Sequence, residues 1–404
     1  MGDSRITRYV SLRKDTMDFT FPPEFIAFRR MVREFCEEEL RPRAKDVDHT
    51  GNVDPGVLRQ MGGLGMLGVP FSQEYSGLGL GEMGYCILME ELNRVCPSTA
   101  TIVGAHTGIG AMSLYLDGAP ALKRKYMPDL CTGRKLAAFA LTEPNAGSDA
   151  AGIQLRATLE GDSYFLDGQK MWITNGPIAD VIMVLAVTDP ALGARGGATV
   201  FAVEKEWQGF EPGKPERKMG LHGSPTSLLT FDEVRVPKEN VVGQVGLGFV
   251  TFMKTLDLGR ITIGAAGLGG AQASLEASVR WAKARSQFGR QIAHMQSIQF
   301  LLAEMAAETE ALRSLVYRTT WLVETGQPFS KEADMCKLFG SEVASRCIDR
   351  ALQIHGALGY SRDFHIERGW RDARIAEIFE GTNEIQRIVI AEHLMQEAGV
   401  RIRP

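Results

Sequence analysis

Four glutamates stand in the stretch IAEIFEGTNEIQRIVIAEHL, residues 375–394. A carboxylate serves as a general base when burial raises its pKa towards neutrality. Glu380 suits this role because the glycine that follows it permits a sharp turn, which would aim the side chain. The pattern alone leaves Glu377 open as an alternative.

The other polar residues of this stretch suit structural roles. Thr382 is suited to cap the N-terminus of a helix, and Glu384 would oppose the helix dipole from its first turn. We expect Glu377 and Glu392 to face solvent or to form ion pairs, as most carboxylates do.

Two earlier segments also carry chemistry. AFALTEPNAGSDAAG (138–152) ends a strand and opens a loop whose hydroxyl and backbone N–H groups could hold a phosphate or the polar edge of a cofactor; the alternative is a plain turn. QKMWITNG (169–176) offers Trp172 and Thr174 to flank a flat heterocycle; the alternative is a hairpin strand.

Several familiar chemistries are excluded. The sequence contains no GxSxG elbow and no P-loop, and GLGGAQ (267–272) fails the dinucleotide fingerprint. Its seven histidines show no HExxH or paired metal spacing, so we expect no metal site. We expect His106, His222 and His355 to be packing or surface residues.

The composition is that of a globular protein of 404 residues, with 44% hydrophobic and 23% charged residues and a net charge of −4. Without a basic stripe, a nucleic-acid partner is not expected. Six cysteines without CxxC pairs indicate free thiols in a reducing compartment. The apolar run 261–271 is too short to span a bilayer. Asp3 and Asp15 argue against a transit peptide, which favours a bacterial cytoplasm over a mitochondrial matrix.

Hydrophobic periodicity predicts the α+β class in four parts. A loose extension (1–16) precedes a helical N-terminal domain (17–135), with helices after Pro22, over 82–95, around 102–116 and after Pro120. A central antiparallel β domain (136–247) of short strands has hairpin turns at Gly161-Asp162 and Asp167-Gly168. Four long helices at 249–285, 298–326, 332–356 and 383–398 then predict a C-terminal four-helix bundle (248–404).

Together, and in this order, the three segments resemble the acyl-CoA dehydrogenase family. LDLGR (256–260), RSQFGRQI (285–292) and QIHGALGY (353–360) extend the resemblance, which runs from about Met17 to the C-terminus. It implies the same three-domain fold, FAD as cofactor, a homotetramer, an acyl-CoA substrate and electron-transfer flavoprotein as electron acceptor.

The resemblance also implies a mechanism. Glu380 takes a proton from Cα of the thioester while a hydride leaves Cβ for flavin N5, which gives a trans-2-enoyl-CoA. The thioester oxygen would accept hydrogen bonds from the Glu380 N–H and a ribityl hydroxyl. Some members place the base directly before the arginine of the LDLGR motif, where this chain has Gly259.

Site residues follow by the same resemblance. FAD contacts within the chain are Leu141, Thr142, Gly147, Ser148, Trp172, Ile173, Thr174, Thr382 and Glu384. A neighbouring subunit would add Arg285, Gln287, Phe288, Gln296, Gln353 and Gly356; Ala357 stands where a second glycine is usual. Acyl-CoA candidates are Ser148, Asp257, Arg260 and Gly381. An ion pair between Asp257 and Arg260 at i,i+3 is the alternative for those two.

The acyl group is less defined by the sequence. The family's acyl tail points towards residues 100–112, where Gly104, Gly108 and Gly110 would leave space for a short, branched or aromatic group; the alternative is close helix packing. No Arg or Lys lies in 97–113 to bind a distal carboxylate. A flavin oxidase or monooxygenase on the same fold, or a non-catalytic CoA-ester-binding scaffold, remain alternative functions.

Overall fold

The computed structural model describes residues 20–400, so the predicted extension 1–16 and the predicted domain start near Met17 lie outside the described residues. The first third of the described chain is helical, as predicted. Its helices are α1 (Pro23–Phe35), α2 (Ala44–Thr50), α3 (Pro55–Gly63), α4 (Gly81–Asn93), α5 (Pro97–Val103), α6 (Met112–Asp117) and α7 (Pro120–Cys131). The helix predicted around 102–116 is α5 and α6 joined by the π-helical segment η3 (Gly104–Ala111).

The middle of the chain folds into an eight-stranded sheet in the order β6-β7-β3-β2-β4-β5-β8, with β1 paired to β4. The strands are β1 (Ala137–Ala140), β2 (Arg156–Glu160), β3 (Ser163–Thr174), β4 (Val181–Val187), β5 (Ala198–Glu204), β6 (Phe210–Pro212), β7 (Thr226–Pro237) and β8 (Val241–Val242). The sheet is mixed rather than purely antiparallel, because β1 runs parallel to β4 and β2 meets β4 in parallel at one residue pair.

Two turn predictions had different outcomes. Gly161-Asp162 joins β2 to β3, with Gly161 at φ +59°, so that hairpin is confirmed. The turn at Asp167-Gly168 is wrong: β3 continues through it, with a bulge between Leu166 and Gly168. Gly168 is needed there because a side-chain carbon would lie only 3.1 Å from the Cα of Leu155.

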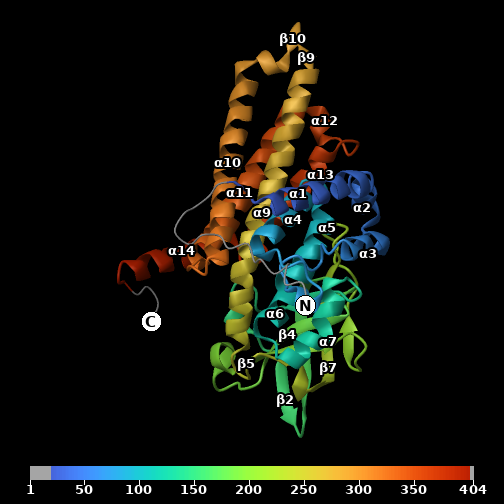
Figure 1. Ribbon diagram of the computed structural model, residues 1–404, viewed down its shortest axis with the longest axis vertical. Coiled ribbons are helices and arrows are strands. Elements are labelled where there is room, and N and C mark those ends of the chain that lie inside the picture. Colours follow the sequence, from blue (N-terminus) through green and yellow to red (C-terminus); the bar gives the residue numbers. More distant parts are fainter. Residues whose placement is uncertain (1–19, 401–404) are drawn as a thin grey trace, which may run out of the picture.

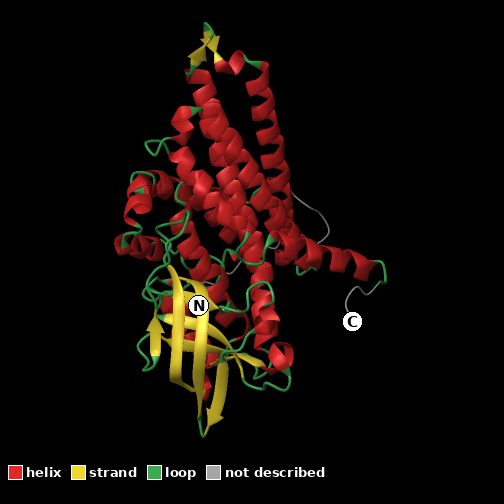
Figure 2. Ribbon diagram, turned by 180° about the vertical axis from the view of Figure 1, so that it is seen from behind, coloured by secondary structure: helices red, strands yellow, loops and turns green. Residues whose placement is uncertain are grey.

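The last third returns to helices: α9 (Gly248–Ala284), α10 (Gln296–Glu324), α11 (Ser330–His355), α12 (Ala357–Tyr360), α13 (His365–Ala373) and α14 (Asn383–Glu397). α9, α10 and α11 run side by side, and α4 packs against α9 and α10 (Figure 1). α14 packs on α11 and projects from the body. A small hairpin of β9 (Ser286–Gln287) and β10 (Arg290–Gln291) links α9 to α10 at the far end from the sheet (Figure 2).

Glycines bring α9 and α11 into backbone contact. A side-chain carbon on Gly267 would lie 2.4 Å from the carbonyl oxygen of Gly340, and one on Gly340 would lie 2.8 Å from the Cα of Gly264. Within GLGGAQ, close backbone packing therefore accounts for Gly267 and Gly269 without a nucleotide.

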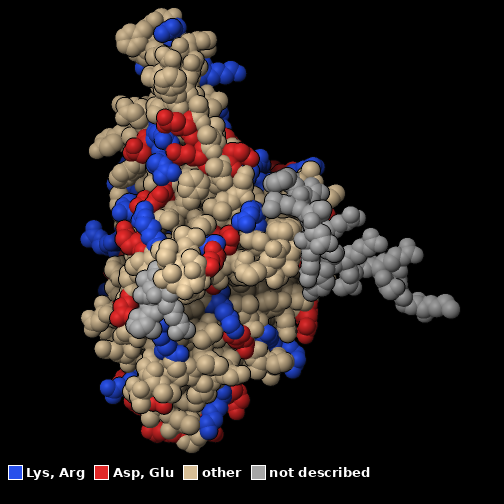
Figure 3. All heavy atoms as spheres, turned by 90° about the vertical axis from the view of Figure 1, so that its left-hand side faces the viewer, with Lys and Arg blue, Asp and Glu red and all other residues tan. Residues whose placement is uncertain are grey.

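Other sequence predictions can be compared directly. All six cysteines are buried free thiols, as expected. His106 is fully buried: its Nε2 lies 3.0 Å from the Leu130 carbonyl oxygen, and its Nδ1 accepts from the Ala137 N–H at 2.9 Å. Between residues 20 and 400, no helix is long and apolar enough to cross a membrane. On the face in Figure 3, acidic and basic side chains are interspersed.

Candidate active site

Glu380 occupies a tight turn between the 3₁₀ segment η7 (Arg374–Glu377) and α14. The turn has two left-handed residues, Glu380 at φ +53° and Gly381 at φ +90°. Thr382 caps α14 as predicted, accepting a hydrogen bond from the Ile385 N–H at 3.3 Å. The side-chain amide of Gln386 donates to the carbonyl oxygens of Glu380 and Gly381 at 3.3 and 3.2 Å. A non-glycine residue held at positive φ in this way is typical of functional sites.

The carboxylate of Glu380 points into the protein. Although the residue as a whole is partly exposed, its Oε2 is buried and has no hydrogen-bond partner among the described residues. Burial raises the pKa of Glu380 from its usual 4.5 to about 7, against the opposing charges of Arg260 and Lys337.

Helix α9 passes directly beside this carboxylate. A side-chain carbon on Gly259 would lie 2.6 Å from Glu380 Oε2 and 3.1 Å from Ile109 Cγ2. Position 259 must therefore be glycine for Glu380 to keep this conformation. Positions 259 and 380, where the resemblance places the base in different family members, are thus adjacent in the structure.

The neighbouring glutamates have other partners. Glu377 pairs with Arg374 at 3.1 Å and accepts a hydrogen bond from the Ser345 hydroxyl at 2.6 Å, which confirms the prediction of an ion pair. Glu384 lies exposed in the first turn of α14, as predicted. Glu392 is half-buried further along α14.

The segments 138–152 and 169–176 pack against each other and are joined by a buried ion pair. Lys170 Nζ donates to Glu143 Oε1 at 2.8 Å and to the Leu141 carbonyl oxygen at 2.9 Å. Glu143 also accepts from the backbone N–H groups of Gln154 and Leu155, at 2.6 and 3.0 Å. Burial lowers the pKa of Lys170 to about 8, and the Glu143 carboxylate opposes this shift. The pair fixes the loop after β1 against the end of β3.

The next residues present an aromatic ring outwards. The Met171 N–H donates to the Thr142 carbonyl oxygen at 2.8 Å, and the pairing of β3 with β7 shifts register between Lys170 and Ile173. Inside that bulge, Trp172 has φ +60° and is 56% exposed, whereas Ile173 is buried. An exposed indole held in a strained conformation, beside a polar loop with exposed Gly147 and Ser148, fits the flat ring system of a cofactor.

The remaining cofactor candidates lie elsewhere. Arg285, Gln287, Phe288 and Gln296 are at the β9–β10 tip, which Figure 1 places at the opposite end of the molecule from the sheet. Phe288 is 94% exposed and has φ +52°. Gln353 and Gly356 end α11. One chain does not bring these residues to Thr142 and Trp172, so their contribution to a neighbour's site stays a prediction.

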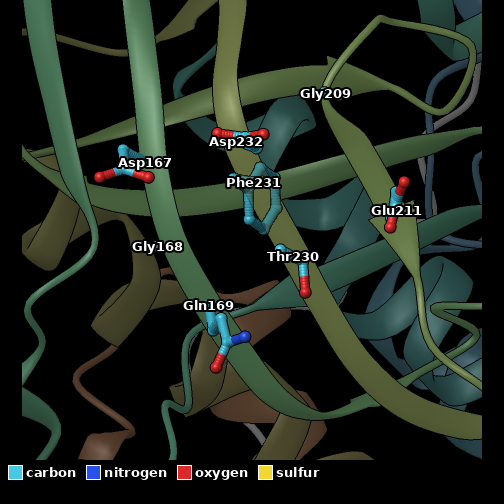
Figure 4. A pocket seen from close by; sticks show the side chains of 8 residues that line it. All are labelled: Asp167, Gly168, Gln169, Gly209, Glu211, Thr230, Phe231 and Asp232. Carbon is cyan, nitrogen blue, oxygen red and sulfur yellow. The ribbon is translucent and has the colours of Figure 1, made fainter.

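A hollow of about 200 Å³ lies at the N-terminus of α14 and includes both Thr382 and Glu384. Arg374 and Arg387 line it together with the carboxylates of Glu342, Glu377 and Glu384, so of its features only the N-terminus of α14 favours an anionic group. The larger hollow, about 340 Å³, lies in the sheet domain and contains none of the predicted site residues (Figure 4). Its carboxylates are Asp167, Glu211 and Asp232.

The acyl-CoA candidates had mixed outcomes. Asp257 and Arg260 form the i,i+3 ion pair at 3.0 Å that was the alternative for them, and Arg260 also contacts Asp334 at 2.8 Å. Ser148 is exposed and Gly381 partly exposed. A role for these four residues in binding acyl-CoA stays a prediction.

The expectation that three glycines leave space for the acyl tail is wrong. Added side-chain carbons would lie 3.3 Å from Met89 Cε at Gly104, 2.8 Å from the Tyr85 hydroxyl at Gly108, and 2.8 Å from Ala137 Cβ at Gly110. The glycines permit close helix packing, and the side chains opposite them fill the room.

Sequence reasoning missed several residues around Glu380, which are Tyr85, Lys337, Ser341, Asn383 and Gln386. One signal was present. Lys337 interrupts the helical series of small and apolar residues Ala333, Cys336, Gly340 and Ala344, all of them buried. A lysine on the buried face of a helix requires a partner.

Comparison with known proteins covers nearly the whole described chain. Family models for the N-terminal, middle and C-terminal domains of acyl-CoA dehydrogenase match residues 22–134, 138–234 and 246–395. The chain belongs to the acyl-CoA dehydrogenase family. The family's enzymes are FAD-dependent flavoprotein oxidoreductases, and a homotetramer is typical of them. Among the described residues no group of three or more His, Cys, Asp or Glu is placed to hold a metal ion.

Two bacterial relatives illustrate the similarity. The chain is 41% identical to a short-chain-specific acyl-CoA dehydrogenase of Clostridium acetobutylicum, covering 93% of this chain and 99% of the relative. It is 40% identical to an NADH-linked acryloyl-CoA reductase of Anaerotignum propionicum, covering 95% and 98%.

Solved structures agree with the fold. Butyryl-CoA dehydrogenase of Megasphaera elsdenii superposes with a TM-score of 0.92 at 40% identity, covering 94% of this chain and 100% of that one. A chain from a structure of the electron-transferring flavoprotein of Acidaminococcus fermentans has the same score and coverage at 41% identity. A Bacillus anthracis acyl-CoA dehydrogenase complexed with FAD gives 0.89 at 35% identity, covering 96% of this chain and 70% of that one.

Proposed function

We propose that the enzyme removes a proton from Cα of an acyl-CoA thioester with Glu380 as the base, giving a trans-2-enoyl-CoA. The supporting observation is the Glu380 carboxylate, whose Oε2 is buried without a hydrogen-bond partner in the described chain and whose pKa burial raises to about 7. Such a base is about half ionised at neutral pH, and its raised pKa lets it take a proton from an activated carbon. When bound, FAD accepts the hydride that leaves Cβ.

The turn at Glu380 and Gly381 would also bind the thioester oxygen of the substrate. The Glu380 N–H donates to the thioester oxygen, which stabilises the negative charge that develops there when Cα loses its proton. The positive φ values of Glu380 and Gly381 present this N–H and the carboxylate from one short piece of backbone, and Gln386 holds that piece in place. Thr142 and Trp172 would hold FAD, and Thr382 at the N-terminus of α14 would contact it as well.

For the acyl group we propose a short chain, including short branched or aryl-bearing forms. Tyr85 is fully buried, its hydroxyl lies against Gly108, and burial raises its pKa, with further contributions from the charges of Glu82 and Glu380. Tyr85 and Met89 therefore fill the side towards which a longer tail would extend. The short-chain specificity of the clostridial relative and the butyryl-CoA specificity of the Megasphaera enzyme support this assignment.

A panel of acyl-CoA substrates tests both the role of Glu380 as the base and the preference for a short acyl group. The FAD-loaded protein should be yellow and should bleach under anaerobic conditions with butyryl-CoA or short branched substrates. Glu380→Gln should keep the colour but not bleach, and Tyr85→Ala should extend bleaching to longer chains. A preference for long straight chains or glutaryl-CoA would contradict the substrate proposal, and bleaching of Glu380→Gln at the wild-type rate would contradict the base.

The reductase relative raises the question of direction. The same carboxylate would return its proton to Cα if the enzyme reduced an enoyl-CoA. Anaerobic incubation with crotonyl-CoA and NADH, with and without electron-transfer flavoprotein, separates the two directions, and oxygen consumption with acyl-CoA tests the oxidase alternative.

We further propose a homotetramer that donates electrons to electron-transfer flavoprotein in a reducing bacterial cytoplasm. The exposed Phe288 at the β9–β10 tip supports a contact with another subunit. The six free thiols and the bacterial relatives support the compartment. Sedimentation of the holoenzyme measures the oligomeric state directly.

A further inference from the structure

Beneath the Glu380 turn lies a fully buried lysine on α11. Lys337 Nζ donates to the side-chain oxygen of Asn383 at 2.8 Å. Asn383 is itself buried and exchanges hydrogen bonds with the hydroxyl of Ser341, at 3.0 and 3.1 Å. Because Asn383 is the first residue of α14 and stands three residues after Glu380, this small network ties the turn to α11.

The charged groups around Glu380 come from several elements. On α9, Arg260 is matched by two carboxylates, Asp257 at 3.0 Å and Asp334 at 2.8 Å. In η7, Glu377 is matched by Arg374. On α14, Glu384 is exposed, and from α4 the Tyr85 hydroxyl stays neutral because burial raises its pKa.

Unlike Arg260, Lys337 has no carboxylate as its hydrogen-bond partner among the described residues. Its ammonium is held by an amide oxygen, and the described residues place no carboxylate oxygen within 4.0 Å of it. A buried cation in this position attracts an uncompensated anion. Glu380 stands three residues before Asn383, its Oε2 has no hydrogen-bond partner in the described chain, and among the neighbouring charges its carboxylate acts most strongly on Lys337.

We infer that Lys337 is a positioning residue for Glu380: through Asn383 it fixes the turn, and its charge favours the ionised form of the base. The inference rests on the proposed role of Glu380. The directions of both pKa shifts agree with it. Burial raises the pKa of Glu380 while Arg260 and Lys337 oppose the rise, and burial lowers the pKa of Lys337 to about 8 while Glu380 opposes the fall. Without Lys337, Glu380 would hold its proton to higher pH.

Two near-isosteric variants test the charge separately from the hydrogen bond. Lys337→Gln removes the cation but can still donate to Asn383, and Asn383→Asp keeps the lysine but gives it a carboxylate partner. Both should move the midpoint of the pH profile for anaerobic flavin bleaching upwards by about one pH unit or more, the shift typical of losing a nearby opposite charge. Lys337→Arg should restore most of the wild-type profile.

The matched control is Lys331→Gln on the same helix, because Lys331 pairs with Glu397 at 2.6 Å, away from the turn, and its loss should leave the midpoint unchanged. A purely structural role would lower the melting temperature without moving the midpoint. If one variant fails to fold, the other still decides. An unchanged midpoint in the variants that fold overturns the inference.

A second readout does not depend on turnover. Difference infrared spectra recorded against pH, with Glu380→Gln used to assign the Glu380 carboxyl band, report the protonation of Glu380 itself. In Lys337→Gln this band should persist to higher pH. If no acyl-CoA bleaches the wild type, the proposed function fails, whereas a band that titrates identically in wild type and both charge variants refutes the role of Lys337 alone.

Discussion

An ionised Glu380 should cost the folded protein stability, and this cost can be measured in Glu380→Gln. The pKa of Glu380 is raised from 4.5 to about 7 in the fold. Between these values the folded protein retains a proton that the unfolded chain releases, so wild-type stability falls as the pH rises from 4.5 to 7. Glutamine has nearly the same shape and is neutral throughout.

The size of the effect follows from the same values. At about 1.4 kcal/mol for each pH unit, the full cost would be roughly 3.5 kcal/mol, and partial exposure of the residue reduces it to roughly 2–3 kcal/mol. With an unfolding entropy of about 2.1 cal/mol/K per residue over the chain, this corresponds to about 2–4 °C in melting temperature. We therefore expect Glu380→Gln to melt above wild type at pH 8 and with it at pH 4.5.

Differential scanning calorimetry from pH 4.5 to 8, at saturating FAD and one protein concentration, measures the difference. Glu377→Gln is the control, because Glu377 is paired with Arg374 and its loss should not stabilise the protein. The reasoning is refuted if Glu380→Gln melts at or below wild type at pH 8, or if the gap does not grow with pH. Either outcome would mean that burying the ionised Glu380 carboxylate does not lower the free energy of unfolding.

Three further outcomes are expected. Lys170→Met leaves the Glu143 carboxylate buried without its cation, which should cost about 3–5 kcal/mol of stability and weaken FAD binding to the apoprotein in calorimetric titration; Lys125→Met, which loses an exposed pair with Glu204, should do neither. His106 has its pKa lowered to about 4 by burial, so stability should fall by up to roughly 3 kcal/mol as pH drops from 6.5 towards 4, and His106→Gln should lose that slope in denaturant titrations. Gly259→Ala should displace the Glu380 carboxylate and slow flavin bleaching on the order of 100-fold, while Gly270→Ala on the same helix, where a side chain meets nothing within 4 Å, should leave the rate unchanged.

Much of the architecture could be predicted because it depends on local patterns. The long helices α9, α10 and α11 follow from uninterrupted helical sequence, and their ends fall within a few residues of the predicted ones. The choice of Glu380 among four glutamates needed the family resemblance in addition, since the sequence pattern left Glu377 open. The capping role of Thr382 needed only local chemistry.

Features that depend on distant contacts could not be predicted from the sequence. Asp167-Gly168 has the composition of a turn, but the approach of Leu155 makes it a bulge inside β3. Gly104, Gly108 and Gly110 suggested open space because nothing local shows that side chains from distant parts of the sequence lie opposite them, namely Met89, Tyr85 and Ala137. Lys337 is 43 positions before Glu380 in the chain, and only the crossing of α11 beneath the turn brings them together.

The single helix α9 links the two ends of the molecule mechanically. Its 37 residues span about 55 Å. The helix begins at Gly248 beside the sheet, passes the Glu380 carboxylate at Gly259, and ends at the hairpin that carries Phe288. Because a helix turns by about 100° per residue, inserting one residue between Gly259 and Gly264 would swing the hairpin round by that angle. The length and the helical phase of α9 therefore fix both the residue that faces Glu380 and the orientation of the β9–β10 hairpin. An insertion or deletion in α9 between these two points would rotate and shift the hairpin relative to the Glu380 site.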